Sequence, residues 1–207
     1  MNKRDLQIIK DLERFRVMSR DDIIELYFSR LKNPVTCANT VLKRLVRDKQ
    51  IGVSKSFTPY VYFPIQSTIK HNSTKIPHFL QLVEVYKQIR KYTTPKTFQI
   101  EPKYKKGLAE PDIFTTIKGA PFFIEVQRNL YSQKVMNEKI KRYEALKISN
   151  EFKPFPFIVM ITSTNYEIQE GDLTVFQVGS IQEFMQNISK KKEKVKEESN
   201  GIKFKIG

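Results

Sequence analysis

The sequence predicts a mixed α+β or α/β chain in two parts, and three observations favour this class. Apolar residues recur at helical spacing through the first quarter of the chain, and two short β runs follow them. Apolar β runs alternating with helical patterns then fill most of the remainder. We expect a helical domain with a β-hairpin over 1–65, a mixed sheet flanked by helices over 76–188, and a basic tail over 189–207. The 207 residues, 40% of them hydrophobic, suffice for one large core or two small ones.

The composition favours a polyanionic partner. Lys and Arg number 37 against 22 Asp and Glu, a net charge of +15. This excess favours nucleic acid first and an acidic membrane surface second, while a merely basic surface is the alternative. The single Cys37 excludes an internal disulfide, and His71 and His78 are too few for a His-based metal site. The sequence shows neither an apolar signal segment nor a run of 18 apolar residues, so we expect a soluble cytoplasmic protein without a membrane partner.

Three helices are expected at the start of the chain. The first covers 3–14, the second follows Ser19 as its N-cap, and the third begins with Asn33 as cap and Pro34 at its first position. Their apolar faces are expected to comprise Leu6, Ile9, Leu12 and Phe15 in the first helix, Ile23, Ile24, Leu26 and Tyr27 in the second, and Val35, Ala38, Val41, Leu42 and Leu45 in the third.

Two short β runs, 51–55 and 60–63, are joined closely enough to form a hairpin. Three helices followed by a hairpin is the layout of a winged helix-turn-helix, whose third helix enters the major groove of duplex DNA. The polar face of the third helix and the wing then predict DNA contacts by Thr36, Asn39, Thr40, Lys43, Arg44, Arg47 and Lys55. The alternative is a protein-interaction or homodimer module whose polar face is only solvated.

The polar stretch 64–75 is the expected linker, and a helix over 76–92 follows it. Phe79, Leu80, Val83 and Tyr86 should form the inner face of that helix. His78 is expected to pack or to cap, and Glu84 is the only acidic residue on the helix.

After a short strand at 98–100, Lys103, Lys105 and Lys106 surround Tyr104. This cluster is predicted to hold DNA phosphates, with Tyr104 free to stack, or else to be a solvated loop. Strands are then expected at 112–117, 122–126, 157–162 and 173–178, and helices at 133–147 and 181–190, the two helices capped by Ser132 and Ser180. Val135, Ile140, Tyr143 and Leu146 should point inward from the first of these helices.

Two carboxylates mark the predicted hairpin at 112–126. Asp112 opens its first strand, Glu125 lies near the end of its second, and the turn between the strands is short. Antiparallel neighbours then bring the two carboxylates to one edge of the sheet. Mg²⁺ or Mn²⁺ requires hard oxygen ligands at such short range.

The motifs Pro111-Asp112 and Glu125-Val126-Gln127 resemble those of the PD-(D/E)XK nuclease-like superfamily, with Gln127 in place of the final Lys. More narrowly, this stretch is similar to the replication-relaxation family of plasmids and other mobile elements. That family typically reads R-P-D, an aromatic-rich strand ending E-V-D-R, and a helix with K-x-x-x-Y. The present chain has Glu110 where Arg is usual, Gln127 where Asp is usual, and Lys139 and Tyr143 at the helical positions.

This resemblance implies a winged helix-turn-helix joined to a PD-(D/E)XK-like core. It implies a DNA-binding protein of a mobile element that acts in replication or transfer, alongside other replication or transfer proteins. If the core cleaves DNA, Asp112 and Glu125 would bind Mg²⁺ or Mn²⁺, with Glu84 as an accessory ligand, and Gln127 with Lys139 would position the water. The alternatives are a transcription or replication regulator whose inactive core serves dimerisation or DNA clamping, and a protein-interaction module without a DNA partner.

Overall fold

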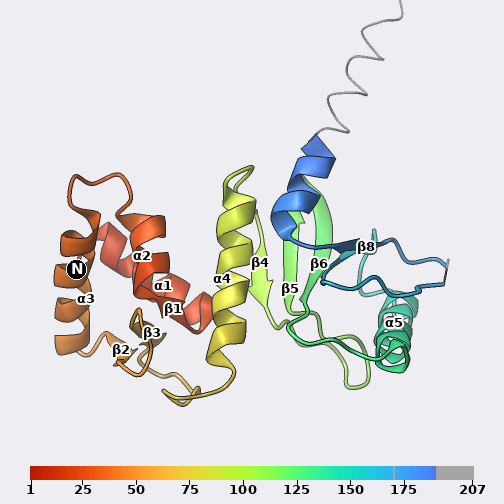
Figure 1. Cartoon of the computed structure of the whole chain (residues 1–207), viewed down its shortest axis with the longest axis horizontal. Helices are drawn as coiled ribbons and strands as arrows, with labels where there is room; N and C mark the ends of the chain where they lie inside the picture. The colour runs from red at the N-terminus through yellow and green to blue at the C-terminus, as the bar shows by residue number, and fades with distance from the viewer. Residues whose placement is uncertain (170, 190–207) are drawn as a thin grey trace, which may run out of the picture.

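A computed structural model describes residues 1–169 and 171–189 of the chain, in a mixed α+β arrangement with two sheets (Figure 1). The first sheet has three strands and the second has five. Most of the predicted basic tail, residues 190–207, lies outside the described residues. Every helix in the described part of the chain is too short or too polar to cross a bilayer.

The first part is built from three helices: α1 (Lys3–Phe15), α2 (Arg20–Tyr27) and α3 (Pro34–Arg47). Asn2 and Ser19 each form a capping box at the start of α1 and α2, which satisfies backbone N–H groups that the helix leaves free. The prediction of Ser19 as a cap is therefore confirmed. Asn33 is the N-cap residue of α3 and Pro34 follows at the first position, as predicted, but the Asn33 side chain makes no capping bond. The fixed φ of Pro34 is therefore the main local start signal of this helix.

The small antiparallel sheet consists of β1 (Met18–Ser19), β2 (Ile51–Ser54) and β3 (Val61–Pro64). β2 and β3 form the predicted hairpin, with Val53 opposite Tyr62. Two apolar residues depart from the predicted helix faces, since Leu6 is 44% and Val35 is 47% exposed. Both lie in the first turns of their helices, and the core is formed by residues further along, among them Ile8, which was not predicted, and Ala38, which was.

Helix α4 (Ile76–Arg90) contacts both parts of the molecule. In Figure 1 it stands between the N-terminal helices and the five-stranded sheet. Phe15 of α1 packs against Tyr86 of α4, with 5.0 Å between ring centroids, and Tyr86 packs against Phe98 of the sheet at 4.9 Å. One continuous apolar cluster consequently extends from α1 through α4 to the sheet. The predicted linker 64–75 contains no helix, and only its first residue belongs to a strand.

The larger sheet consists of β4 (Phe98–Ile100), β5 (Ile113–Ile117), β6 (Ala120–Val126), β7 (Phe157–Ile161) and β8 (Val175–Val178). β4, β5 and β6 are antiparallel, whereas β6, β7 and β8 are parallel. Helix α5 (Gln133–Ile148) supplies the crossover that the parallel pair β6–β7 requires. The predicted mixed sheet flanked by helices is confirmed.

The helices cover the two faces of this sheet with different apolar clusters. α4 and the helix over residues 181–189 share a cluster with Ile113, Ile117 and Phe122. α5 shares the other with Phe123 and Ile158. Ser180 accepts a bond from the Glu183 N–H, which confirms its predicted capping role. Val135 is 49% exposed rather than inward, and its neighbour Met136 is buried in its place.

Candidate functional site

The β5–β6 hairpin brings Asp112 and Glu125 together. Ile113 pairs with Ile124, so the next residues along the antiparallel register, Asp112 and Glu125, face each other at the end of the ladder. The Val126 N–H donates to Asp112 Oδ2 at 2.7 Å and fixes that side chain against the end of β6. The structure thus juxtaposes the two carboxylates as the sequence predicts.

Glu125 is only 4% exposed and is held by two side chains from α5. Lys139 Nζ donates to Glu125 Oε2 at 2.5 Å, and the Tyr143 hydroxyl donates to Glu125 Oε1 at 2.5 Å. Lys139 and Tyr143 are four residues apart, which places them on the same face of the helix. The predicted placement of Lys139 beside the carboxylates is therefore present, and Tyr143 has a polar contact that its apolar interpretation missed.

Burial and charge oppose each other at this site. Burial raises the pKa of Glu125, and the nearby Asp112 carboxylate raises it further, while Lys139 and Tyr143 oppose the shift. Burial alone would lower the pKa of Lys139, but the Glu125 carboxylate outweighs it and raises that pKa. Burial also raises the pKa of Tyr143 well above its ordinary value. Lys139 accordingly stays protonated and Tyr143 stays a hydrogen-bond donor.

His78 completes the surroundings of Asp112. Its Nε2 lies 3.3 Å from Asp112 Oδ1, and both side chains are about one-fifth exposed, at 20% and 21%. The sequence indicated His78 chiefly as a packing or capping residue, with its resemblance to a His often found at this place in the replication-relaxation family as the alternative. His78 lies in the first turn of α4, directly before the buried Phe79. From there its imidazole reaches Asp112, just before the start of β5.

Gln127, just beyond β6, has partners other than the two carboxylates. Its Nε2 donates to the Asn129 carbonyl oxygen at 2.8 Å and also contacts the Tyr166 hydroxyl. Its buried Oε1 has no hydrogen-bond partner among the described residues. Tyr166 in turn receives the Tyr131 N–H at 3.0 Å, so Gln127 belongs to a polar network that anchors the loop between β6 and α5.

Glu84 lies apart from the other predicted metal ligands. Its carboxylate contacts Lys87 at 2.8 Å and accepts from Gln88 at 2.9 Å. Lys87 is only 10% exposed and also pairs with Asp22 and Glu25 of α2 at 2.8 Å each. Glu84 therefore contributes to the contact between α4 and α2, and the structure does not bring it to Asp112.

The surroundings of the carboxylate pair do not fit a divalent metal well. Each of the four carboxylate oxygens already has a protein partner: Lys139, Tyr143, the Val126 N–H and His78. Mg²⁺ prefers six oxygen ligands in near-octahedral geometry and retains several waters. An ammonium group in contact with Glu125 opposes both the charge and the hydration of such an ion.

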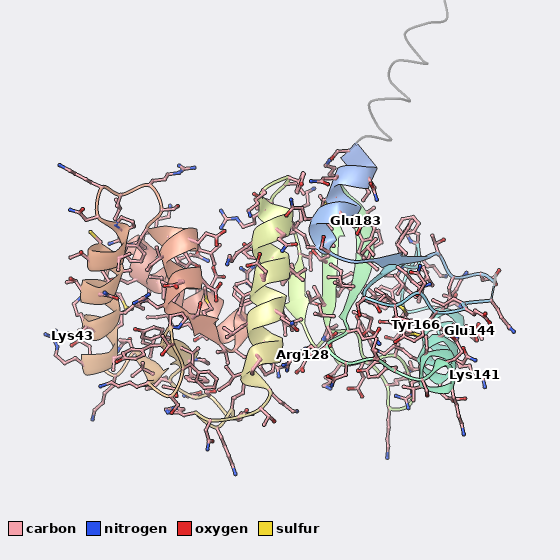
Figure 2. All side chains as sticks on the ribbon, viewed as in Figure 1. Lys43, Arg128, Lys141, Glu144, Tyr166 and Glu183 are labelled. Atoms are coloured by element: carbon pink, nitrogen blue, oxygen red, sulfur yellow. The ribbon has the colours of Figure 1, made fainter. Side chains whose placement is uncertain are left out.

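A second candidate site is a groove of about 720 Å³ between α3 and the β2–β3 hairpin. Asn39 and Lys43 line it from α3, and Lys55 and Tyr60 line it from the hairpin. Figure 2 shows Lys43 on the outer side of α3, pointing away from the rest of the molecule. Thr36 and Thr40 are also exposed on α3, with the Thr40 hydroxyl donating to the Thr36 carbonyl oxygen at 3.0 Å.

The two arginines on α3 that were predicted to contact DNA both form ion pairs within the protein. Arg44 donates to Asp5 Oδ2 at 2.7 Å, and the Asp5 side chain is only 1% exposed, so Arg44 ties α3 to α1. Arg47 is exposed and pairs with Asp48 at 2.9 Å. Both arginines are thus paired within the protein, whereas Asn39 and Lys43 line the groove.

The basic loop before β5 combines exposed lysines with a packed tyrosine. Lys103, Lys105 and Lys106 are exposed, although Lys103 pairs with Glu110 at 2.6 Å. Tyr104 packs edge-on against Phe152, with 5.4 Å between ring centroids, and burial raises its pKa to about 12. Tyr104 was expected to be available for stacking on a base, and its partly buried ring instead packs against the apolar cluster beneath α5.

Comparison of the chain with protein-family models, with curated proteins and with solved structures found no match.

Proposed function

We propose that this protein binds duplex DNA through α3 and the β2–β3 hairpin, which together act as a winged helix-turn-helix. The observation that carries the proposal is the groove between them, which is lined by the polar side chain of Asn39 and by two cations, Lys43 from the helix and Lys55 from the hairpin. Cations on two elements can contact phosphates, while an Asn on the helix can pair with the edge of adenine. The net charge of +15 supplies the long-range attraction that such binding requires.

We further propose a setting in the cytoplasm, in replication or transfer of a plasmid or other mobile element. The support is the motif resemblance to the replication-relaxation family together with the facing carboxylates Asp112 and Glu125 on adjacent strands. Of the two roles for the PD-(D/E)XK-like core, the contacts of Lys139 and Tyr143 with Glu125 favour an inactive core used for dimerisation or DNA clamping. Metal-dependent nicking, with Mg²⁺ or Mn²⁺, is the competing candidate.

Fluorescence anisotropy with a labelled duplex tests the DNA-binding proposal. Replacing both Lys43 and Lys55 with Ala should weaken binding by roughly tenfold or more, because two phosphate contacts are lost. Lys96→Ala is a matched control, since this exposed lysine lies in the loop between α4 and β4, away from the groove. Asn39→Ala should instead reduce the preference for one sequence over another. Equal affinities of wild type and the double variant would refute the proposal.

Incubation with supercoiled plasmid separates the two roles of the core. An inactive core predicts that plasmid remains supercoiled with either Mg²⁺ or Mn²⁺, in wild type and in Asp112→Ala alike. Nicking by wild type that disappears in Asp112→Ala would favour the competing candidate. DNA affinity measured on the same samples shows whether the DNA-binding part is intact.

A further inference from the structure

We propose that Lys139, paired with Glu125, is a built-in counter-ion for the Asp112–Glu125 pair and takes the place of a divalent metal there. In this proposal the wild-type chain does not take a metal at this position, and removing the Lys139 ammonium creates a divalent-cation site. The inference deepens the proposed inactive core and rests on the contacts of the carboxylate pair. It does not depend on DNA binding by α3.

Charge is the first reason. Two carboxylates that face each other at the end of a hairpin repel, and the repulsion is stronger where one of them is shielded from water. The side chain of Glu125 is only 5% exposed, so water screens its charge poorly. A cation is therefore required, and Lys139 Nζ already supplies one at 2.5 Å from Glu125 Oε2. The Asp112 carboxylate also acts on Lys139, adding to the rise in the pKa of that lysine.

The second reason is that Lys139 is held where it lies. Its side chain is 30% exposed, and its Nζ stands 5.9 Å from the centre of the Tyr131 ring, within the range of a cation–π contact. The Tyr131 N–H is itself bonded to the Tyr166 hydroxyl, which fixes the loop that carries the ring. A lysine that contacts both a carboxylate and an aromatic ring is more restrained than a surface lysine without such partners.

Competition for the oxygens is the third reason. Tyr143 occupies Glu125 Oε1, the Val126 N–H occupies Asp112 Oδ2, and Lys139 occupies Glu125 Oε2. A metal ion entering here must displace Lys139 or approach its ammonium closely, and like charges oppose the second course. Without Lys139, Glu125 Oε2 becomes free beside Asp112 while the pair still requires a counter-charge.

Titration with Mn²⁺, followed by calorimetry and by electron paramagnetic resonance of the free ion, tests the proposal. Lys139→Met keeps an unbranched side chain of similar length but removes the ammonium. This variant should bind one Mn²⁺ at least about tenfold more tightly than wild type, since the competing charge is gone. Lys141→Met is the matched control, because Lys141 lies on the same helix and pairs with the exposed Glu138 at 3.1 Å.

A further variant assigns the ion to this pair. Adding Glu125→Gln to Lys139→Met should abolish the new Mn²⁺ site, and circular dichroism shows whether each variant is folded. If Lys139→Met fails to fold, Lys139→Gln replaces it.

Two results would overturn the proposal. One is a wild-type Mn²⁺ site that Glu125→Gln removes, because Lys139 would then not exclude the metal. The other is a folded Lys139 variant that binds no more Mn²⁺ than wild type does. Neither result bears on the affinity for duplex DNA, which is measured separately.

Discussion

Arg44 shows at the scale of one residue how a cation that resembles a DNA contact can be structural. Its guanidinium donates to the buried Asp5, which caps the first turn of α1 together with Asn2. Burial tends to raise the pKa of Asp5, but the bond from Arg44 helps to outweigh it, and the pKa lies below the ordinary value of 3.8. Because the folded-state pKa is lowered, the stabilisation is present above pH 3.8 and is lost as pH falls through the folded-state value.

Replacing Arg44 with Ala should therefore lower the melting temperature at pH 7, because a buried carboxylate loses its partner. The difference from wild type should shrink as the pH falls below 3.8 toward the folded-state pKa, because Asp5 then becomes protonated in wild type as well and Arg44 no longer pairs with a carboxylate. Thermal denaturation at a series of pH values measures this. Lys43→Ala, on the exposed side of the same helix, should leave the melting temperature nearly unchanged. A pH-independent loss in Arg44→Ala would contradict a structural ion pair with Asp5.

Single residues also mark where prediction from sequence stops. The Asp112–Glu125 juxtaposition could be predicted because it depends only on a short turn and the antiparallel register. The roles of His78 and Tyr143 could not, since each depends on how a helix packs against the sheet. The i, i+4 spacing of Lys139 and Tyr143 indicates that the two side chains share one face of the helix. It does not indicate which residues of the sheet that face contacts.

At the scale of elements, α4 is fastened to α2 by Lys87. This lysine is 10% exposed, and its Nζ lies 2.8 Å from each of Asp22, Glu25 and Glu84. Burial alone would lower the pKa of Lys87, but its carboxylate partners outweigh it and raise that pKa. The ammonium thus remains charged and compensates Asp22, whose side chain is also 10% exposed.

Lys87→Met should lower the free energy of unfolding by about 3 kcal/mol, because it leaves the shielded Asp22 without its counter-ion. Urea denaturation monitored by circular dichroism measures the change. Lys91→Met is the control, since Lys91 is exposed at the end of the same helix. A loss for Lys87→Met no larger than that for Lys91→Met would show that this ion cluster contributes little.

The elements themselves were largely predictable. Helical spacing, capping residues and alternating runs located α1 to α5 and the main strands to within a few residues. β1 was missed because two residues carry no periodicity, and it exists only through pairing of Met18 and Ser19 with β3. Two details of α3 were missed for a related reason: the Asn33 side chain makes no capping bond, and Val35 is exposed. Both depend on how the first turn of α3 packs.

At the scale of the whole molecule, the two predicted domains share a core. Phe15 of α1, Tyr86 of α4 and Phe98 of β4 are in mutual contact, and Arg16 pairs with Glu101 at 2.7 Å. Composition and the polar linker gave no sign of this, because sequence patterns identify apolar faces without showing which faces meet. The domain boundaries therefore remain a prediction.

We expect the chain to unfold in one cooperative transition, because separating the parts would expose the aromatic contacts around α4. Differential scanning calorimetry should show a single peak whose calorimetric and van't Hoff enthalpies agree. Circular dichroism and intrinsic tyrosine fluorescence should report the same midpoint. Two resolved transitions would indicate that the parts fold independently.

DNA binding by the groove is tested most sharply by its salt dependence, in wild type and in the variant with both Lys43 and Lys55 replaced by Ala. Anisotropy titrations at several salt concentrations give the slope of log affinity against log salt concentration, which reports the phosphates neutralised. Phosphate contacts by these two lysines predict a slope shallower by about 2 in the variant, roughly 0.9 for each lost contact. The same slope in both proteins would contradict DNA binding by the groove between α3 and the hairpin.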